Sequence, residues 1–462
     1  MSLITKIATL LSQDSKQNMN NIRPKFHITA PSNWINDPNG VIKFKGKYHV
    51  FYQHHPYGIT WGPMHWGHVI SDDLLNWEHL PIALTPGDTF DKDGCFSGSA
   101  FVYEDKLYVV YTGFIFNEDP EKIRQQQCLA YSEDGIHFKK LGLIIGEDNL
   151  PKEFAPNDFR DPMVFKENNH FVMLVAARRK EGRGNILRYE SNDLLSWTFV
   201  SSILPSDSEG VMIECPDYVS DLNLLLYCEQ FQPVNGYLHH NIHSTDWEIG
   251  KFVDHKFNKT NKGMIDYGFD FYAPQVILGD NILIGWLDMW DRNNPSEEYG
   301  FAGSLTVPRH ISVKNNELYQ KPVLPKNKKE EKDITDIEYV EHVKYGFYKL
   351  EITDLESLHI SFRKGDEHQT IFYLNENEWV FDRSHSGKEI KGNETDSDSL
   401  NGIRKLPYIK NKKHEIYLVM DEFSVELFVD GKSLSSLIYP DLSDDLLQIV
   451  IKSKNTKLIK YL

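Results

Sequence analysis

The sequence predicts an all-β protein in two parts, a five-bladed β-propeller followed by a C-terminal antiparallel β-sandwich. Two patterns that recur along the chain predict the propeller, and short runs of alternating polarity near the C-terminus predict the sandwich. The chain has 462 residues, which is too long for one ordinary domain. We expect an N-terminal helical extension over 1–24, the propeller over 25–322, a linker over 323–335 and the sandwich over 336–462.

The first recurring pattern is a serine, an aspartate two residues later, and an aromatic residue. It appears as SDDLLNW (71–77), SEDGIHF (132–138) and SNDLLSW (191–197), with HSTDW (243–247) as a shorter relative. A strand-rich pattern that recurs about every sixty residues is typical of propeller blades.

The second pattern is a β-hairpin, made of two strand-like runs joined by a polar turn. Its five copies are VIKFKGKYHVFYQ (41–53), AFVYEDKLYVVYTG (100–113), MVFKENNHFVMLVAA (163–177), YVSDLNLLLYCEQ (218–230) and VILGDNILIGWLD (276–288). Further strand-like sequence follows each copy, so five blades are predicted. A β-sandwich is the alternative for this region, but it does not explain the regular spacing.

The segments that flank the propeller have their own patterns. The apolar residues Leu3, Ile4, Ile7, Leu10 and Leu11 share one face of a helix. The charged run LPKNKKEEKDITD (324–336) is typical of a solvated linker or a short helix. After it, runs such as GFYKLEI, SLHISFRK, HEIYLVMD and SVELFVDG alternate as antiparallel strands do.

Composition and charge restrict the class of protein. The net charge is −17 and the pI is about 5.6, which argues against a nucleic-acid or anionic-membrane partner. The four cysteines form no C-x-x-C pair, and neither a signal-peptide core nor a membrane-length apolar run is found. We therefore expect a cytoplasmic protein with reduced thiols; the sequence gives no indication of its oligomeric state.

Three carboxylates precede three of the hairpins. Asp37 stands before Pro38, Asp161 lies in Arg-Asp-Pro, and Glu214 lies in Glu-Cys-Pro. Taken singly, each is explained as a turn residue, an ion-pair partner or a structural carboxylate. Equivalent positions in different blades face one axial funnel, so together they predict a shared site. Two carboxyl groups that divide the roles of nucleophile and acid are typical of glycoside hydrolysis.

The motifs that carry these carboxylates resemble a known family. WINDPNG, FSGS, FRDP, ECPD and DYGFDFYAPQ occur in the order found in glycoside hydrolase family 32, the β-fructofuranosidases, and FDRSHSG and SVELFVDG extend the resemblance into the second part. The resemblance implies that Asp37 is the nucleophile, Glu214 the acid/base and Asp161 the stabiliser of the transition state. We expect Glu214 to be protonated, its pKa raised by apolar surroundings and by the charge of Asp37.

The resemblance also implies a fructose-binding pocket and a substrate class. The matching pocket positions are Asn36, Gln53, Trp61, Phe96, Ser97, Arg160 and Trp286, with Trp34 and Ile35 of the same strand as Asn36 serving binding or packing. The implied substrate is sucrose 6-phosphate or sucrose, cleaved with retention. The alternative is a cytoplasmic sucrase or fructo-oligosaccharide hydrolase without phosphate preference. Arg124 and Arg292 are candidate phosphate ligands, although no Gly-rich phosphate loop is present.

Two other classes of function are compatible with a five-bladed propeller. One is an inverting glycosidase acting on arabinose or xylose polymers, and the other is a propeller that binds sugar without catalysis. WINDPNG together with ECPD argues against the first, and the presence of both Asp37 and Glu214 argues against the second. We expect no cofactor and no metal, because His65 and His68 stand three residues apart in a strand and no second cluster joins them.

Overall fold

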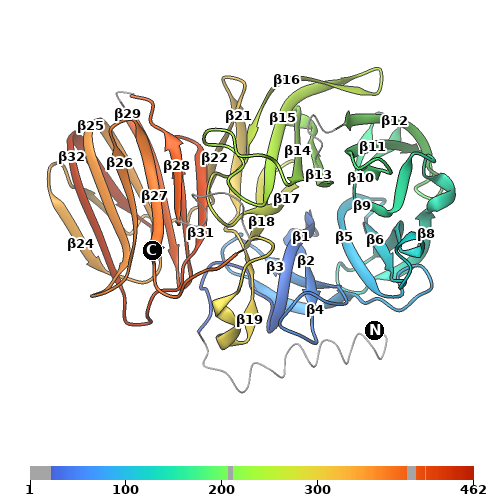
Figure 1. Ribbon diagram of the computed structural model, residues 1–462, viewed down its shortest axis with the longest axis horizontal. Helices are drawn as coiled ribbons and strands as arrows, with labels where there is room; N and C mark the ends of the chain where they lie inside the picture. The colour runs from blue at the N-terminus through green and yellow to red at the C-terminus, as the bar shows by residue number, and fades with distance from the viewer. Residues whose placement is uncertain (1–21, 206–211, 393–401, 411–412, 462) are drawn as a thin grey trace.

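The protein consists of a β-propeller and a β-sandwich lying side by side, as the sequence predicts (Figure 1). The computed structural model describes residues 22–205, 212–392, 402–410 and 413–461. Of the predicted N-terminal extension, residues 1–21 lie outside the described residues. In the described part of the chain, no helix is long and apolar enough to cross a membrane.

Five antiparallel sheets form the propeller, and the chain completes them nearly in order. The short strand β19 is an exception, because it pairs in parallel with β1 and so closes the first blade with a distant segment. The first blade contains β1 (Asn33–Phe44), β2 (Lys47–His55), β3 (His65–Ser71), β4 (Glu78–Leu84) and β19 (Phe301–Ala302), and the second contains β5 (Gly94–Tyr103), β6 (Lys106–Ile115), β7 (Arg124–Ser132) and β8 (Lys139–Ile145). The third blade contains β9 (Phe154–Glu167), β10 (His170–Arg179), β11 (Gly184–Ser191) and β12 (Thr198–Pro205), and the fourth contains β13 (Ile213–Val219), β14 (Leu224–Gln230), β15 (His243–Val253) and β16 (Lys256–Met264). The fifth blade contains β17 (Tyr272–Ile277), β18 (Ile282–Leu287), β20 (Ser304–Leu305), β21 (Arg309–Lys314) and β22 (Glu317–Pro322).

The two recurring sequence patterns occupy fixed places in the blades. Each of the five hairpins forms the first two strands of its blade. The serine–aspartate pattern forms the turn between the third and fourth strands of the first three blades. In the first blade the Ser71 hydroxyl accepts the backbone N–H of Leu74, and Asp73 accepts those of Leu75 and Asn76. The fourth copy, HSTDW, instead begins strand β15, so its likeness to the other three is not structural.

The first strand of every blade has a β-bulge near its start. The ladder shifts register between Ile35 and Pro38 in β1, and β5, β9, β13 and β17 shift at the corresponding place. Asp161 and Cys215 adopt positive φ angles of 63° and 50° there, a conformation that few residues other than glycine take. The bulges turn side chains out of the ladders at one end of the propeller.

The second part is built around two long strands. β25 pairs with β29 through its first half and with β26 through its second half, while β32 follows it along nearly its whole length. A buried apolar core, including Tyr348, Phe362 and Leu427, fills the sandwich. Its strands are β23 (Glu330–Asp333), β24 (Glu338–His342), β25 (Gly346–Lys364), β26 (Gln369–Asn375), β27 (Glu378–His385), β28 (Ile403–Pro407), β29 (Lys413–Asp421), β30 (Ser424–Val429), β31 (Lys432–Leu437) and β32 (Leu446–Lys460).

The predicted linker is partly strand. Residues Glu330–Asp333 form β23, which pairs with β32 at the edge of the sandwich, so the second half of the charged run belongs to the second part of the molecule. The only described helices are four short 3-10 turns, namely η2 (Pro120–Lys122), η3 (Glu147–Asn149), η4 (Ser220–Leu222) and η5 (Pro295–Tyr299). The exact domain boundaries stay a prediction.

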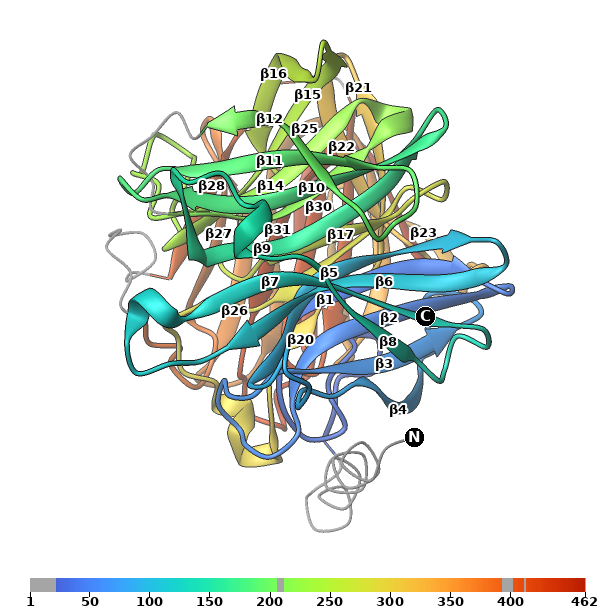
Figure 2. The same ribbon diagram turned by 90° about the vertical axis from the view of Figure 1, so that its right-hand side faces the viewer.

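Buried charges join the two parts. Arg309 of β21 binds Asp266 at 2.9 Å and Glu426 of β30 at 2.5 Å. The ring of His27 lies between Glu426 and Asp421, each 2.8 Å from one of its nitrogens. All five side chains are fully buried. The sandwich is therefore docked on the propeller through a polar network, and Figure 2 shows the two stacked one behind the other.

Candidate active site

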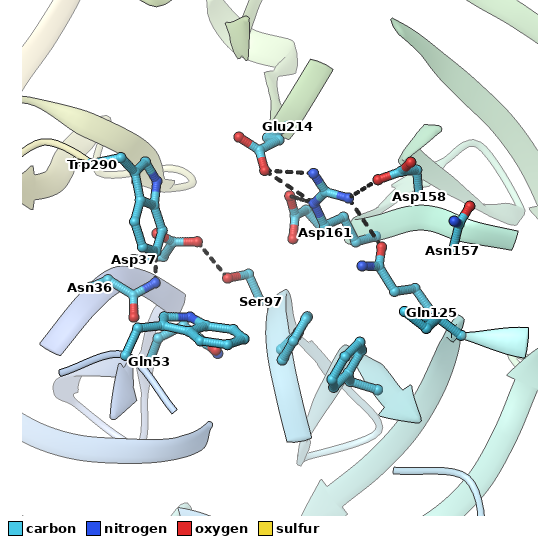
Figure 3. A pocket seen from close by; sticks show the side chains of 15 residues that line it. Asn36, Asp37, Gln53, Ser97, Gln125, Asn157, Asp158, Asp161, Glu214 and Trp290 are labelled. Carbon is cyan, nitrogen blue, oxygen red and sulfur yellow. Dashed lines mark hydrogen bonds and ion pairs between the residues drawn. The ribbon is translucent and has the colours of Figure 1, made fainter. Parts of the chain in front are cut away.

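A cavity of about 380 Å³ opens at the propeller end where the bulges lie. Figure 3 shows the carboxyl groups of Asp37, Asp161 and Glu214 around this single cavity. They come from β1, β9 and β13, the first strands of three different blades. The residues that line the cavity are Asn36, Asp37, Gln53, Trp61, Phe96, Ser97, Phe114, Ile123, Gln125, Asn157, Asp158, Arg160, Asp161, Glu214 and Trp290.

Asp37 is held by two neighbours. The Ser97 hydroxyl donates to its Oδ2 at 2.6 Å, and the Asn36 amide donates to its Oδ1 at 3.0 Å. Asn36 is oriented in turn by the Trp34 indole N–H, which donates to its Oδ1 at 2.8 Å. The carboxylate of Asp37 is therefore fixed in one orientation at the floor of the cavity.

Asp161 and Asp37 both lie close to Cys215. The backbone N–H of Cys215 donates to Asp161 Oδ2 at 3.0 Å. The Cys215 sulfur is 3.6 Å from Asp161 Oδ2 and 3.8 Å from Asp37 Oδ2. Cys215 precedes Pro216 as Asp37 and Asp161 precede their prolines, and it is the first unpaired residue of its bulge, as Asp161 is.

Glu214 is one residue out of register with Asp161. It is the last paired residue before the bulge in β13, as Arg160 is in β9. This offset places it against Arg160, which donates to Glu214 Oε1 from Nη2 at 2.7 Å and from Nε at 3.1 Å. The Tyr272 hydroxyl donates to the other oxygen, Oε2.

The electrostatics of the three carboxyl groups differ. Burial raises the pKa of Asp161 to about 7, and the nearby charges of Glu214 and Asp37 add to this effect. Burial likewise raises the pKa of Asp37, although hydrogen bonds from Ser97 and Asn36 oppose it. Of the three carboxyl groups, Asp161 and Glu214 lie against Arg160, and Asp37 is bound by uncharged groups, so at least one of the three resists ionisation.

The prediction of a raised pKa for Glu214 is wrong for this structure. Burial alone would raise it, but the charge of Arg160 and smaller contributions from His243 and Tyr272 outweigh burial, so the pKa of Glu214 lies below its usual value. The prediction took account of the charge of Asp37 but not of the ion pair between Glu214 and Arg160. A proton in this cavity is therefore favoured on the aspartates.

The structure brings most of the predicted binding residues into the lining. Asn36, Gln53, Trp61, Phe96, Ser97 and Arg160 line the cavity. Trp34, Ile35 and Trp286 do not; they are buried in the apolar cluster beneath it. The indole at the wall is that of Trp290, whose ring centroid is 5.0 Å from that of Trp286 and 6.1 Å from that of Trp34. Direct contact with a ligand is thus expected of Trp290 in place of Trp286.

Several residues that line the cavity were not predicted from the sequence. Asp158 stands two residues before Arg160, and a period of two places both on one face of β9. Gln125 comes from the neighbouring blade and accepts Arg160 Nη1 at 3.1 Å, a contact that no local pattern signals. Trp290 lies beyond the end of β18, where loop geometry decides which of two tryptophans reaches the cavity.

The histidines considered as metal ligands have other partners. His65 Nδ1 lies 2.9 Å from the carbonyl of Pro63, and its Nε2 lies 3.3 Å from the Tyr57 hydroxyl. His68 Nε2 contacts His49 Nδ1 at 3.0 Å. Neither residue lines the cavity.

The chain matches known proteins over nearly its whole length. Residues 27–322 match the model for the glycosyl hydrolases family 32 N-terminal domain, and residues 315–461 match the family 32 C-terminal model. The sucrose-6-phosphate hydrolase of Zymomonas mobilis is 37% identical, over 90% of this chain and 87% of its own. The raffinose invertase of Escherichia coli is 34% identical, over 90% and 89%.

Solved structures agree with this grouping. The GH32 beta-fructofuranosidase BmSUC1 of Bombyx mori has a TM-score of 0.84 and 30% sequence identity, and the match covers 99% of this chain and 97% of that enzyme. The two family models together span both parts of the fold. The chain therefore belongs to glycosyl hydrolase family 32.

Proposed function

We propose that the protein is a retaining β-fructofuranosidase that hydrolyses the fructoside bond of sucrose 6-phosphate or sucrose through a fructosyl-enzyme intermediate. The observation that carries this proposal is the meeting of Asp37, Asp161 and Glu214 at one cavity, supplied by three separate blades. Similarity to a sucrose-6-phosphate hydrolase and a beta-fructofuranosidase supports the same substrate class.

In the first step, Asp37 attacks the anomeric carbon of the fructosyl unit while the bond to the leaving sugar breaks. Glu214 gives its proton to the departing oxygen, so the glucose unit leaves as a neutral alcohol. The hydrogen bonds from Ser97 and Asn36 fix the attacking carboxylate. A carboxylate ester of fructose on Asp37 results.

In the second step, water replaces the carboxylate. Glu214, now ionised, takes a proton from the water, whose oxygen bonds to the anomeric carbon as the ester bond to Asp37 breaks. Two displacements at one carbon give net retention. Asp161 stays beside the reacting centre, where an ionised carboxyl accepts sugar hydroxyls and stabilises positive charge in the transition state.

The distribution of protons must change when substrate binds. Arg160 favours the ionised form of Glu214, whereas the pKa values of Asp37 and Asp161 are raised. Sugar hydroxyls that donate to the two aspartates stabilise their charged forms and lower their pKa values. The shared proton then moves to Glu214, whose oxygen meets the glycosidic oxygen. The three groups titrate as one coupled system.

A second candidate, a sucrase without phosphate preference, is favoured by the charge of the cavity. Among the described lining residues Arg160 is the one cation, and it already contacts Glu214, Asp158 and Gln125. Arg292, considered as a phosphate ligand, is instead buried against Asp270 at 2.5 Å. Arg124 pairs with Glu147 beside the lining residue Ile123. A bound phosphate dianion would have to compete with these contacts.

Kinetics with both sugars decides between the two candidates. A phosphate-selective enzyme gives a kcat/KM at least about tenfold higher for sucrose 6-phosphate, mainly through a lower KM, because the phosphate is remote from the bond that breaks. Comparable values identify a sucrase. Hydrolysis of neither sugar would contradict the proposed function itself.

The acid role of Glu214 has its own test. Glu214→Gln removes the proton donor, so hydrolysis of sucrose falls by several powers of ten, whereas a fructoside whose leaving group departs without a proton loses far less. Equal losses on both substrates would exclude the assignment. Proton NMR of the first-formed product gives the stereochemistry; β-fructofuranose appears first if the configuration is retained.

We also infer a cytoplasmic location. The four cysteines are free and buried, as expected of reduced thiols, and sucrose 6-phosphate is made inside the cell by phosphorylating uptake. Fractionation of cells with an antibody to the protein tests this inference.

A further inference from the structure

A line of alternating charges extends from Glu214 away from the reacting centre. Arg160 binds Glu214, and its Nη1 also binds Asp158 Oδ1 at 3.0 Å. The other oxygen of Asp158 accepts Arg178 Nε at 2.6 Å, and Arg178 Nη2 binds the same oxygen. Asp158 lines the cavity, whereas Arg178 does not.

These side chains are held on strands. Asp158 and Arg160 lie on β9, and Arg178 lies on the neighbouring strand β10. Ala177 pairs with Phe159, and the ladder loses its regular register just beyond this pair, where Asp158 and Arg178 lie. The contacts of Arg178 Nε and Nη2 with Asp158 therefore hold the two side chains together where the ladder does not.

We propose that Asp158 and Arg178 are positioning residues that set how strongly Arg160 holds Glu214 in its ionised form, and thereby the pH range in which Glu214 serves as an acid. This inference rests on the proposed function. The guanidinium of Arg160 is shared between Asp158 and Glu214, so a stronger attraction to Asp158 weakens its pairing with Glu214. Arg178 reduces the attraction between Asp158 and Arg160, because it partly neutralises Asp158 from the other side.

Other groups also act on Glu214, and they are unchanged in the test. Asp161 faces it from β9, Asp37 from β1 and Tyr272 from β17; the remaining neighbours that act on it are Cys228 of β14 and His243 of β15. Substitutions at Asp158 and Arg178 leave all of these in place. A change in the titration of Glu214 then reports on the charges of Asp158 and Arg178, which act on Glu214 through Arg160 and directly across the space between them.

The two substitutions have opposite expected effects. Arg178→Gln leaves Asp158 without its outer cation, so Asp158 draws Arg160 away and the pKa of Glu214 rises. Asp158→Asn leaves Arg160 with one carboxylate fewer, so its charge acts more fully on Glu214 and the pKa falls. A shift of several tenths of a unit up to about one unit is expected in each direction. A merely structural role would not produce opposite signs.

The experiment measures the titration of Glu214 in two ways. Carbon NMR of the full chain labelled at glutamate carboxyls follows Glu214 directly, with Glu214→Gln identifying its signal. The alkaline limb of kcat/KM for sucrose follows it in the reaction; it moves to higher pH in Arg178→Gln and to lower pH in Asp158→Asn. Arg178→Lys restores the wild-type profile in part or in full.

The matched control is Arg179→Gln. Arg179 is the next residue, carries the same charge and lies over the ring of Phe154 at 5.1 Å, away from Asp158. Its loss leaves both readouts unchanged. Shifts of the same sign in Arg178→Gln and Asp158→Asn, or an effect of Arg178→Gln no larger than the control, would overturn the proposal.

If Arg178→Gln does not fold, Asp158→Asn decides the matter. Absence of a downward shift in Asp158→Asn then rejects the inference. If the wild type hydrolyses no fructoside, the proposed function fails, while the NMR titration still decides whether Asp158 and Arg178 act on Glu214.

Discussion

The cavity of the propeller and the interface with the sandwich both contain buried carboxylates, but they balance charge differently. At the interface each carboxylate meets a cation: Asp266 binds Arg309, Glu426 binds Arg309 and His27, and Asp421 binds His27. In the cavity, Asp161 and Glu214 share Arg160 with Asp158, whereas Asp37 is bound by the uncharged side chains of Ser97 and Asn36. We call the interface balanced because every one of its three carboxylates contacts a cation, and the cavity unbalanced because Asp37 is bound by uncharged groups.

The consequence appears in the pKa values. At the interface, burial alone would raise the pKa values of Asp421 and Glu426. His27 lowers the pKa of Asp421, and Arg309 and His27 lower that of Glu426, so both lie below their usual values. In the cavity, burial prevails and the pKa values of Asp37 and Asp161 are raised. A balanced network keeps its charges fixed and holds two parts together, whereas an unbalanced one holds a proton that can move.

The largest expected effect separates catalysis from stability at Asp37. Asp37→Asn should lower kcat for sucrose by several powers of ten, on the order of 5 kcal/mol in activation free energy, because the nucleophile is lost. The melting temperature should stay close to that of the wild type. Asp288→Asn is the control: burial raises the pKa of Asp288 to about 8, so at neutral pH it is largely uncharged, as the amide is, and it lies outside the cavity lining. Near-normal turnover by Asp37→Asn would contradict the assignment.

The next effect concerns the balanced network. Arg309→Met leaves Asp266 and Glu426 buried without a partner, so the free energy of unfolding should fall by about 3–5 kcal/mol while folded molecules keep their kcat. Arg188→Met is the matched comparison, since Arg188 is equally buried but its partners Glu167 and Glu190 are partly exposed. Urea unfolding of both variants measures the difference. A loss for Arg309→Met no greater than for Arg188→Met would mean that burial of the partners does not matter.

A smaller effect depends on pH. Hydrogen bonds and charges from Asp421 and Glu426 overcome burial and raise the pKa of His27 to about 9, from an ordinary value of 6.5. Because the folded pKa is the higher one, this stabilisation is complete below pH 6.5 and is lost as pH rises through 9, a change of roughly 3 kcal/mol.

Unfolding by urea from pH 6 to pH 9 tests this, with His27→Gln as the comparison. Other groups titrate in the same range, among them Asp161 and Asp217 with pKa values of about 7, so the difference between the wild-type and variant curves isolates His27. Parallel curves for the two proteins would show that His27 does not carry a proton at the interface.

The smallest expected effect lies at the wall of the cavity. The Trp61 side chain lines the cavity, is 46% exposed and meets the Phe96 ring edge-on at 5.8 Å. Trp61→Ala should raise KM for sucrose about tenfold, or about 1.4 kcal/mol, with little change in kcat, because a flat apolar wall binds ground and transition states alike. Phe116→Ala, at an exposed aromatic outside the lining, should leave KM unchanged. A fall in kcat with KM unchanged would show that Trp61 acts in the chemical step and not in substrate binding.

Much of the architecture followed from local sequence because each blade repeats one local rule. Alternation of polarity and a tight turn make a hairpin wherever they occur, so five copies gave five blades, and the positions before the hairpins gave the mouth where Asp37 and Asp161 meet. The copy HSTDW misled, because a short string of residue types does not distinguish a turn from the start of β15.

Only the tertiary structure decided which side chains contact the buried carboxylates and how far their pKa values shift. Sequence determined that carboxylates would come to one end of the propeller, since strand period and repeat spacing are local properties. It did not determine that Glu214 would pair with Arg160, that Trp290 rather than Trp286 would reach the cavity, or that His27 would lie between Asp421 and Glu426 nearly four hundred residues away. The pKa of a buried group depends on burial and on charges within a few ångströms, and those neighbours come from other blades and from the sandwich. The three carboxylates that meet in the cavity can therefore be found from the sequence, while their protonation is a property of the folded molecule.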